Sequence, residues 1–217
     1  MAGDILQFER SSGNTVIWLQ NPRLVQQISR SALLMADIEA SPPRSSIDKQ
    51  LVRVNHRTRE IVQHTFKEMA KDSVRNGLFI FTSLFARHPS YINIWPDFRK
   101  MPFTFLMSSP YFQRHTTVYM SALRMIIDYL DNDTQLAGIL TRIAKAHIKH
   151  DIHKFHLMDM VEAVRDVAWS CNKREFTRAE VDAAWKLLYD VIANFIDIYR
   201  AEALKEMSNV ERNSIND

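Results

Sequence analysis

Eight histidines are the residues of this sequence best suited to chemistry, and four of them recur at three-residue spacing: His147, His150, His153 and His156. Side chains three residues apart on a helix rotate by about 60° per step, so four of them cannot converge on one metal ion. A zinc-protease helix would need a His-Glu-x-x-His motif, which the sequence lacks. The run therefore predicts a solvated helix end and loop for His153 and His156 rather than a zinc site.

Two other positions place histidine on the apolar face of a predicted helix. Residues spaced by three or four share such a face, and here they form two sets, His115, Tyr119, Ala122, Ile126 and Leu130 in one helix and Leu136, Leu140, Ile143 and His147 in the next. Burial there would leave imidazole nitrogens without water. Each histidine could be a separate core residue bonded to a backbone carbonyl, or the two could share a ligand. Haem iron suits the second interpretation, because neutral imidazole is its usual protein ligand.

The elements that must position these histidines are predicted to be helices. The 217 residues include only four glycines, which excludes glycine-rich phosphate loops, dinucleotide-binding motifs and most turn-dense β folds. Helical periodicity without strand-like alternation runs from Asp48 onward. Expected helices cover about 50–71, 77–87, 111–130, a segment after a cap at 131–133, 155–171, and a last one opened by a Thr177–Glu180 capping box. The fold class is all-α.

The sequence is expected to divide into three regions. Residues 1–48 read as an N-terminal extension with one short helix after Asn21-Pro22 and a Ser/Pro-rich linker at 41–46. Residues 49–204 form the helical domain, and residues 205–217 form a polar C-terminal tail. The proline-rich segment 89–111 is expected to form short, packed turns.

Composition narrows the functional classes. The net charge is +3, which is weak support for a nucleic-acid or anionic-membrane partner, and nucleic acid is not expected. Cys171 is the only cysteine, so no disulfide framework exists and a reducing compartment is expected. The sequence shows neither an apolar run of membrane-spanning length nor a signal-peptide pattern, so a cytoplasmic location is expected.

Several segments together resemble the globin family. Residues 113–132 resemble the distal helix with its histidine, and 136–147 resemble the proximal helix. Residues 147–152 resemble the segment after the proximal histidine, and 176–199 resemble the last globin helix. Inserted proline-rich turns and long extensions look most like nematode-type globins. The resemblance implies a globin fold, with six to eight helices around a haem pocket.

The resemblance also implies roles for individual residues. His147 would ligate the iron of haem b (iron protoporphyrin IX) from the proximal side, His115 would lie over the distal face as a candidate sixth ligand, and His150 would contact a propionate. The implied cavity walls are Phe81, Trp95, Phe98, Tyr119, Ile143 and Ile152. Trp95 stands where phenylalanine is usual, and Tyr119 where a small aliphatic residue is common. The Tyr119 hydroxyl could turn toward the ligand or away to a backbone carbonyl.

The implied function is the binding of oxygen or another diatomic gas, without enzymatic activity. One alternative is a six-coordinate, bis-histidyl globin acting in electron transfer or gas sensing. Another is a dioxygenase or pseudo-peroxidase, which would need an external reductase because the sequence shows no flavin or nicotinamide domain. A cofactor-free helical interaction module is the last alternative. The sequence leaves the oligomeric state undetermined.

Overall fold

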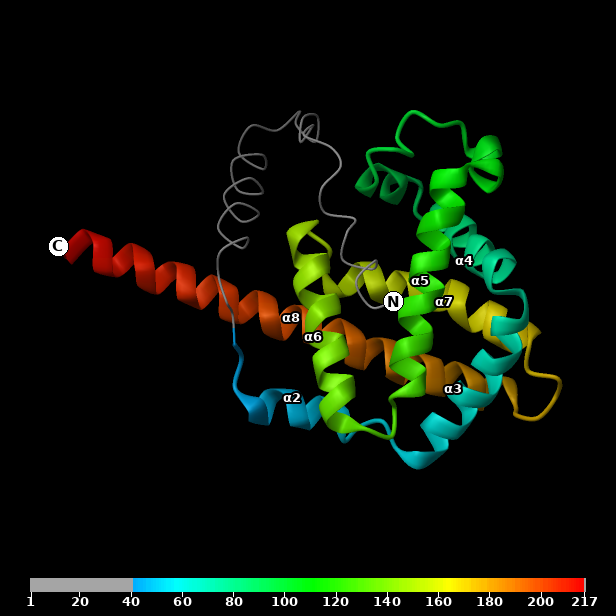
Figure 1. Cartoon of the computed structure of the whole chain (residues 1–217), viewed down its shortest axis with the longest axis horizontal. Helices are drawn as coiled ribbons and strands as arrows, with labels where there is room; N and C mark the ends of the chain where they lie inside the picture. Colours follow the sequence, from blue (N-terminus) through cyan, green and yellow to red (C-terminus); the bar gives the residue numbers. More distant parts are fainter. Residues whose placement is uncertain (1–40, 217) are drawn as a thin grey trace.

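Helices make up all of the regular structure in the part of the chain that the computed structural model describes, residues 41–216 (Figure 1). The α-helices are α2 (Arg44–Leu51), α3 (His56–Met69), α4 (Ser73–Arg87), α5 (Pro110–Asp128), α6 (Asp133–Lys149), α7 (Lys154–Ser170) and α8 (Arg178–Asn216). Three short 3₁₀ helices are η2 (Ala70–Asp72), η3 (Pro89–Ile94) and η4 (Phe103–Ser108). The all-α prediction is confirmed, and η3 and η4 lie in the segment predicted as short turns.

Side-chain caps determine where the site-bearing helices begin. The Ser109 side chain accepts a hydrogen bond from a backbone N–H of the first turn of α5, and Pro110 takes the first helical position. Asn132 caps α6 in the same way, because its Oδ1 accepts a hydrogen bond from the Gln135 N–H at 3.0 Å. The predicted capping box is present: the Thr177 N–H donates to Glu180 Oε2 at 2.9 Å, and the Glu180 N–H donates to Thr177 Oγ1 at 3.3 Å.

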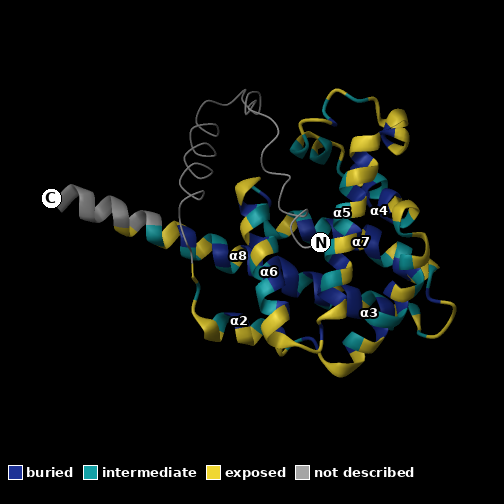
Figure 2. Ribbon diagram, viewed as in Figure 1, coloured by how far each residue is buried: buried dark blue, intermediate teal, exposed yellow. Residues whose placement is uncertain are grey.

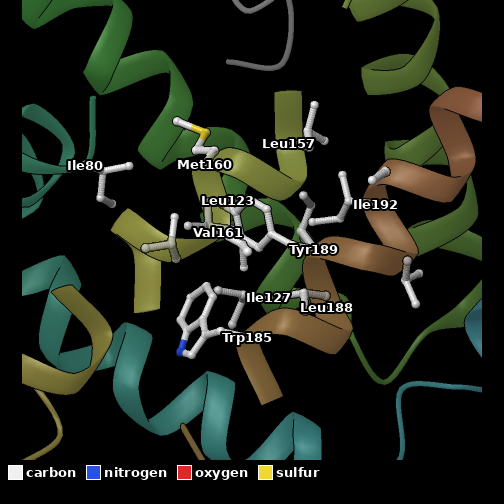
Figure 3. Packing of buried hydrophobic residues seen from close by; sticks show 14 of the residues in the cluster. Ile80, Leu123, Ile127, Leu157, Met160, Val161, Trp185, Leu188, Tyr189 and Ile192 are labelled. Carbon is white, nitrogen blue, oxygen red and sulfur yellow. The ribbon is translucent and has the colours of Figure 1, made fainter. Parts of the chain in front are cut away.

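The long helix α8 forms the centre of the packing, because α2, α3, α6 and α7 all pack against it. Its predicted apolar face is fully buried: Val181, Trp185, Leu188, Ile192, Phe195 and Tyr199. Figure 3 shows Trp185, Leu188 and Ile192 within the core that α8 shares with α5 and α7. Trp185 keeps its indole N–H satisfied by donating to Thr65 Oγ1 of α3 at 3.0 Å.

Helices α4 and α5 cross closely at Gly77. A Cβ at this position would lie 3.1 Å from Thr116 Cβ and 3.3 Å from the Thr116 carbonyl oxygen, which is tighter than ordinary packing contacts. Since Thr116 follows His115, the missing side chain at Gly77 lets the helix bearing His115 approach the helix bearing Phe81.

The single helix predicted over 50–71 is two helices in the structure. Helix α2 ends at Leu51, and Asn55 caps α3 by accepting from the Thr58 N–H at 2.9 Å. Helix α2 also crosses the expected boundary at residue 48, because Ile47 and Leu51 are buried and the helix packs against α6 and α8. Their four-residue spacing gives α2 a small apolar face of its own.

The predicted polar C-terminal tail is helical, because α8 continues to Asn216. Its sequence from residue 201 is rich in alanine, glutamate, lysine and leucine, which favour helix even without burial. Lys205 also pairs with Glu202 at 3.2 Å, one turn apart. The short helix expected after Asn21-Pro22 lies outside the described residues.

Deleting residues 1–40 is expected to change the free energy of unfolding by less than about 2 kcal/mol and to leave cofactor binding intact. Deleting residues 1–52 instead removes Ile47 and Leu51 from the core, and burial of two aliphatic side chains stabilises by about 3 kcal/mol or more. Urea unfolding of the two truncated chains measures the difference. Equal losses from both deletions would show that residues 1–40 themselves stabilise the domain.

Candidate functional site

His147, in the last turn of α6, has the geometry of a metal-binding imidazole. Its Nδ1 lies 2.7 Å from the carbonyl oxygen of Ile143. A carbonyl only accepts hydrogen bonds, so Nδ1 must carry the proton and Nε2 must carry the lone pair. Burial lowers the pKa of His147, and the neighbouring His150 lowers it further. The imidazole is therefore neutral near pH 7 and can offer Nε2 to a metal.

The corner after His147 is held by backbone and side-chain bonds. The Ile152 N–H donates to the His147 carbonyl oxygen at 3.0 Å, and Ile152 is buried. Asp151 adopts a left-handed backbone conformation, with φ of 55°, which aspartate tolerates better than most residues. Arg200 of α8 stabilises the corner by donating hydrogen bonds to Asp151 Oδ1 at 3.2 Å and to the Ile152 carbonyl oxygen at 2.9 Å. His150 is exposed at this corner.

His115, in the second turn of α5, is surrounded by aromatic rings from two other segments, helix α4 and the turn that follows η3. Its ring centroid lies 5.0 Å from that of Phe81, 5.1 Å from Trp95 and 6.2 Å from Phe98. The rings meet edge to face, which is a favourable arrangement for aromatic groups. The structure thus places three of the six predicted cavity-wall residues, Phe81, Trp95 and Phe98, around His115.

Electrostatics link His115 to the α6 histidines. Burial, with smaller contributions from the charges of His147 and His150, lowers the pKa of His115 to about 4. An effect of this kind requires the three imidazoles to lie within electrostatic reach of one another. The lowered pKa values mean that His115 and His147 are both mainly neutral near pH 7.

Tyr119, one turn after His115, directs its hydroxyl into the core. The hydroxyl forms a hydrogen bond with that of Tyr189 in α8, and burial raises the pKa of both phenols. The partner is thus neither a backbone carbonyl nor a ligand, the two alternatives left open by the sequence. The Tyr119 ring stands edge-on to Phe81 at 5.1 Å. This pair anchors α5 to α8 beside the site.

Sequence reasoning missed Tyr189, Phe85 and Phe112. Phe85 and Phe112 are buried in the same aromatic cluster, with ring centroids 6.0 Å and 6.2 Å from that of Phe81. Helical spacing could have found both, because Phe85 is four residues after Phe81 and Phe112 three before His115. Tyr189 could have been found in the same way, because it lies four residues after Trp185 and three before Ile192.

The other two histidines of the run lie at the start of α7. His153 Nε2 lies 3.0 Å from Asp151 Oδ1, and His156 Nδ1 accepts from the His153 N–H at 3.0 Å. The ring of His156 packs against Tyr91 at 4.8 Å. Both side chains are partly buried rather than fully solvated, because η3 and the corner pack around them.

Comparison with known proteins identifies the family. The Globin family model matches residues 78–196. Cytoglobin-2 of Oryzias latipes is 25% identical over 131 residues, 59% of this chain and 73% of that protein. Neuroglobin-1 of Oncorhynchus mykiss is 21% identical over 141 residues, 64% of this chain and 88% of that protein. The finer resemblance to nematode-type globins stays a prediction, because these relatives are a cytoglobin and a neuroglobin.

Solved structures share the fold. Aplysia limacina myoglobin superposes with a TM-score of 0.60 at 19% identity, covering 68% of this chain and 97% of its own. The hexa-coordinate hemoglobin of Drosophila melanogaster has a TM-score of 0.58 at 23% identity, covering 65% and 92%. Within residues 41–216, no helix is long and apolar enough to cross a membrane. Because the family model covers more than half of the sequence, the chain belongs to the globin family.

Proposed function

We propose that this globin binds haem b between His147 and His115 and binds oxygen or another diatomic gas reversibly at the iron. The hydrogen bond from His147 Nδ1 to the Ile143 carbonyl oxygen is the observation that carries the proposal. It fixes the tautomer and the ring orientation, so Nε2 is the nitrogen available to a metal.

The residues of the site suit a haem. Neutral imidazole is the ligand form that iron requires, and the lowered pKa of His147 provides it. The aromatic rings of Phe81, Trp95 and Phe98 offer the apolar surface that a porphyrin needs. His150 is exposed near His147, where a propionate would reach solvent. Bound haem supplies an iron that takes up diatomic gases reversibly.

The distal residues have defined tasks in this proposal. His115 stays neutral near pH 7, so it keeps one N–H donor and one lone pair. The donor can bond a polar gas, whereas the lone pair can ligate iron directly. Phe81 and Trp95, packed on His115, exclude water from this side.

A bis-histidyl, six-coordinate form in redox or gas sensing is the second candidate. It is supported by the aromatic rings packed on His115 and by the contribution of the His147 charge to the lowered pKa of His115. A structural neighbour is described as a hexa-coordinate hemoglobin, although at 23% identity this likeness concerns the fold. An external reductase and a cytoplasmic location stay predictions from the sequence.

The absorption spectrum of the purified chain tests haem binding directly. We expect an intense haem absorption band when the protein is expressed in cells supplied with iron. After reconstitution with added haem, each chain should bind one haem. Binding of carbon monoxide to the reduced protein should then shift the spectrum, which demonstrates gas binding. A colourless protein that takes up no added haem would favour a cofactor-free interaction module.

A further inference from the structure

Exposed apolar side chains gather at one end of the molecule. Four lie within nine consecutive residues of η4 and the first turn of α5: Phe103 (48% exposed), Phe105 (62%), Met107 (37%) and Tyr111 (65%). The segment lies beside the N-terminal end of α5 at the upper right of Figure 1, and Figure 2 shows it as largely exposed. Gathered apolar side chains of this kind mark a contact with a partner or a membrane.

Positive charge concentrates in the same part of the chain. The whole sequence carries a net charge of +3, yet residues 73–127 contain six basic residues and one acidic residue, Asp97. The surplus of positive charge therefore lies in this part of the chain. Three of the basic residues, Arg99, Lys100 and Arg114, flank the exposed apolar side chains, and both Lys100 and Arg114 are exposed.

We propose that residues 99–114 form a membrane-contact tip that binds the surface of an anionic phospholipid bilayer. In this arrangement the exposed aromatic side chains enter the boundary between headgroups and acyl chains, and the flanking cations contact lipid phosphates. The exposed side chains of η4 can insert into a fluid lipid surface without a complementary pocket, which a folded protein partner would have to provide. The near absence of acidic residues removes the repulsion that an anionic surface would otherwise exert.

Sedimentation with lipid vesicles tests the proposal on the haem-loaded, full-length chain. We expect binding to vesicles of phosphatidylcholine with phosphatidylserine, and much weaker binding to phosphatidylcholine alone. Added salt should weaken the binding, because it screens attraction between the cations and the lipid phosphates.

Variants with matched controls separate the tip from the rest of the surface. Phe103→Ser with Phe105→Ser should lower the vesicle partition coefficient at least about tenfold, since two large apolar side chains no longer leave water. Lys100→Gln should lower it roughly fivefold. Two control variants change the same residue types elsewhere on the surface: Phe155→Ser in α7, where the side chain is 53% exposed, and Lys186→Gln in α8. Each control should alter the vesicle partition coefficient by less than about twofold.

Four results would overturn the proposal. The first is no binding to phosphatidylserine vesicles at low salt, and the second is an equal loss in the control variants. The third is loss of haem or a changed haem spectrum in the double phenylalanine variant, which would assign these side chains to the haem site. The fourth is a concentration-dependent dimer that the same variant abolishes, which would assign the tip to a contact between two copies. Lys100→Gln and the salt titration keep the test valid if the double variant misfolds.

Discussion

Replacing His147 with alanine is expected to reduce haem retention at least about tenfold and to leave a spectrally altered haem in whatever fraction stays bound. Truncation removes the nitrogen that the Ile143 carbonyl holds in place for the iron, and only apolar contact with the porphyrin is left. The haem-to-protein absorbance ratio after gel filtration measures the loss. Added imidazole should restore part of the original spectrum, because a free imidazole can enter the space vacated by the side chain.

His150→Ala provides the matched control, since it removes an imidazole three residues further along the same corner. His150 is exposed, so a contact with a propionate is screened by water and contributes about 0.5–1 kcal/mol. Its haem content should stay close to that of the unmodified protein. If His147→Ala kept its haem and spectrum while His150→Ala lost them, the proximal ligand would be His150 instead.

The two central histidines could be located from the sequence because each shares its apolar face with other residues of the same helix. His115 and His147 recur in step with neighbours three or four residues away, and this periodicity depends only on local helix geometry. The apolar face of the last helix could be predicted in the same way, and all of its predicted residues are buried against neighbouring helices.

Features that depend on contacts between distant segments could not be read in this way. The bond between Tyr119 and Tyr189 joins residues 70 positions apart, and neither spacing nor composition relates them. Helix α2 likewise depends on the burial of Ile47 and Leu51 against α6 and α8, which are distant in the sequence. Residue spacing predicts which face of each helix is apolar. Tertiary packing determines which of these faces contact one another and where each helix ends.

The reduced, ligand-free protein is expected to hold a six-coordinate iron, with His115 and His147 on opposite faces of the haem. The two histidines lie 32 residues apart on consecutive helices, and the charge of His147 already influences the pKa of His115. The lowered pKa keeps the His115 imidazole neutral near pH 7, and a neutral imidazole has a lone pair that can bond iron. Ligation requires a nitrogen about 2 Å from the metal.

The surroundings of His115 favour this outcome over an open distal site. Phe81 and Trp95 pack on the imidazole at 5.0 Å and 5.1 Å between ring centroids, and their apolar rings offer no hydrogen-bonding group to hold a water molecule there. The Tyr119 hydroxyl, which could have held His115 away from the iron, is bonded to Tyr189 instead. Gas binding to such a site would begin with the departure of His115, so the affinity for gas would depend on how readily α5 releases it.

The visible spectrum of the reduced protein decides between the two forms. Sharp, split bands indicate two axial imidazoles, and they should disappear in His115→Leu, whereas His56→Leu, the same change at the exposed start of α3, should keep them. The split bands should also persist between about pH 6 and pH 8, because a pKa of about 4 keeps His115 neutral throughout that range. A single broad band in the unmodified protein would instead mean that His147 alone ligates the iron. In that case the aromatic residues around His115 would act as the wall of an open gas site, and reversible oxygen binding without ligand exchange would be the simpler account of the fold.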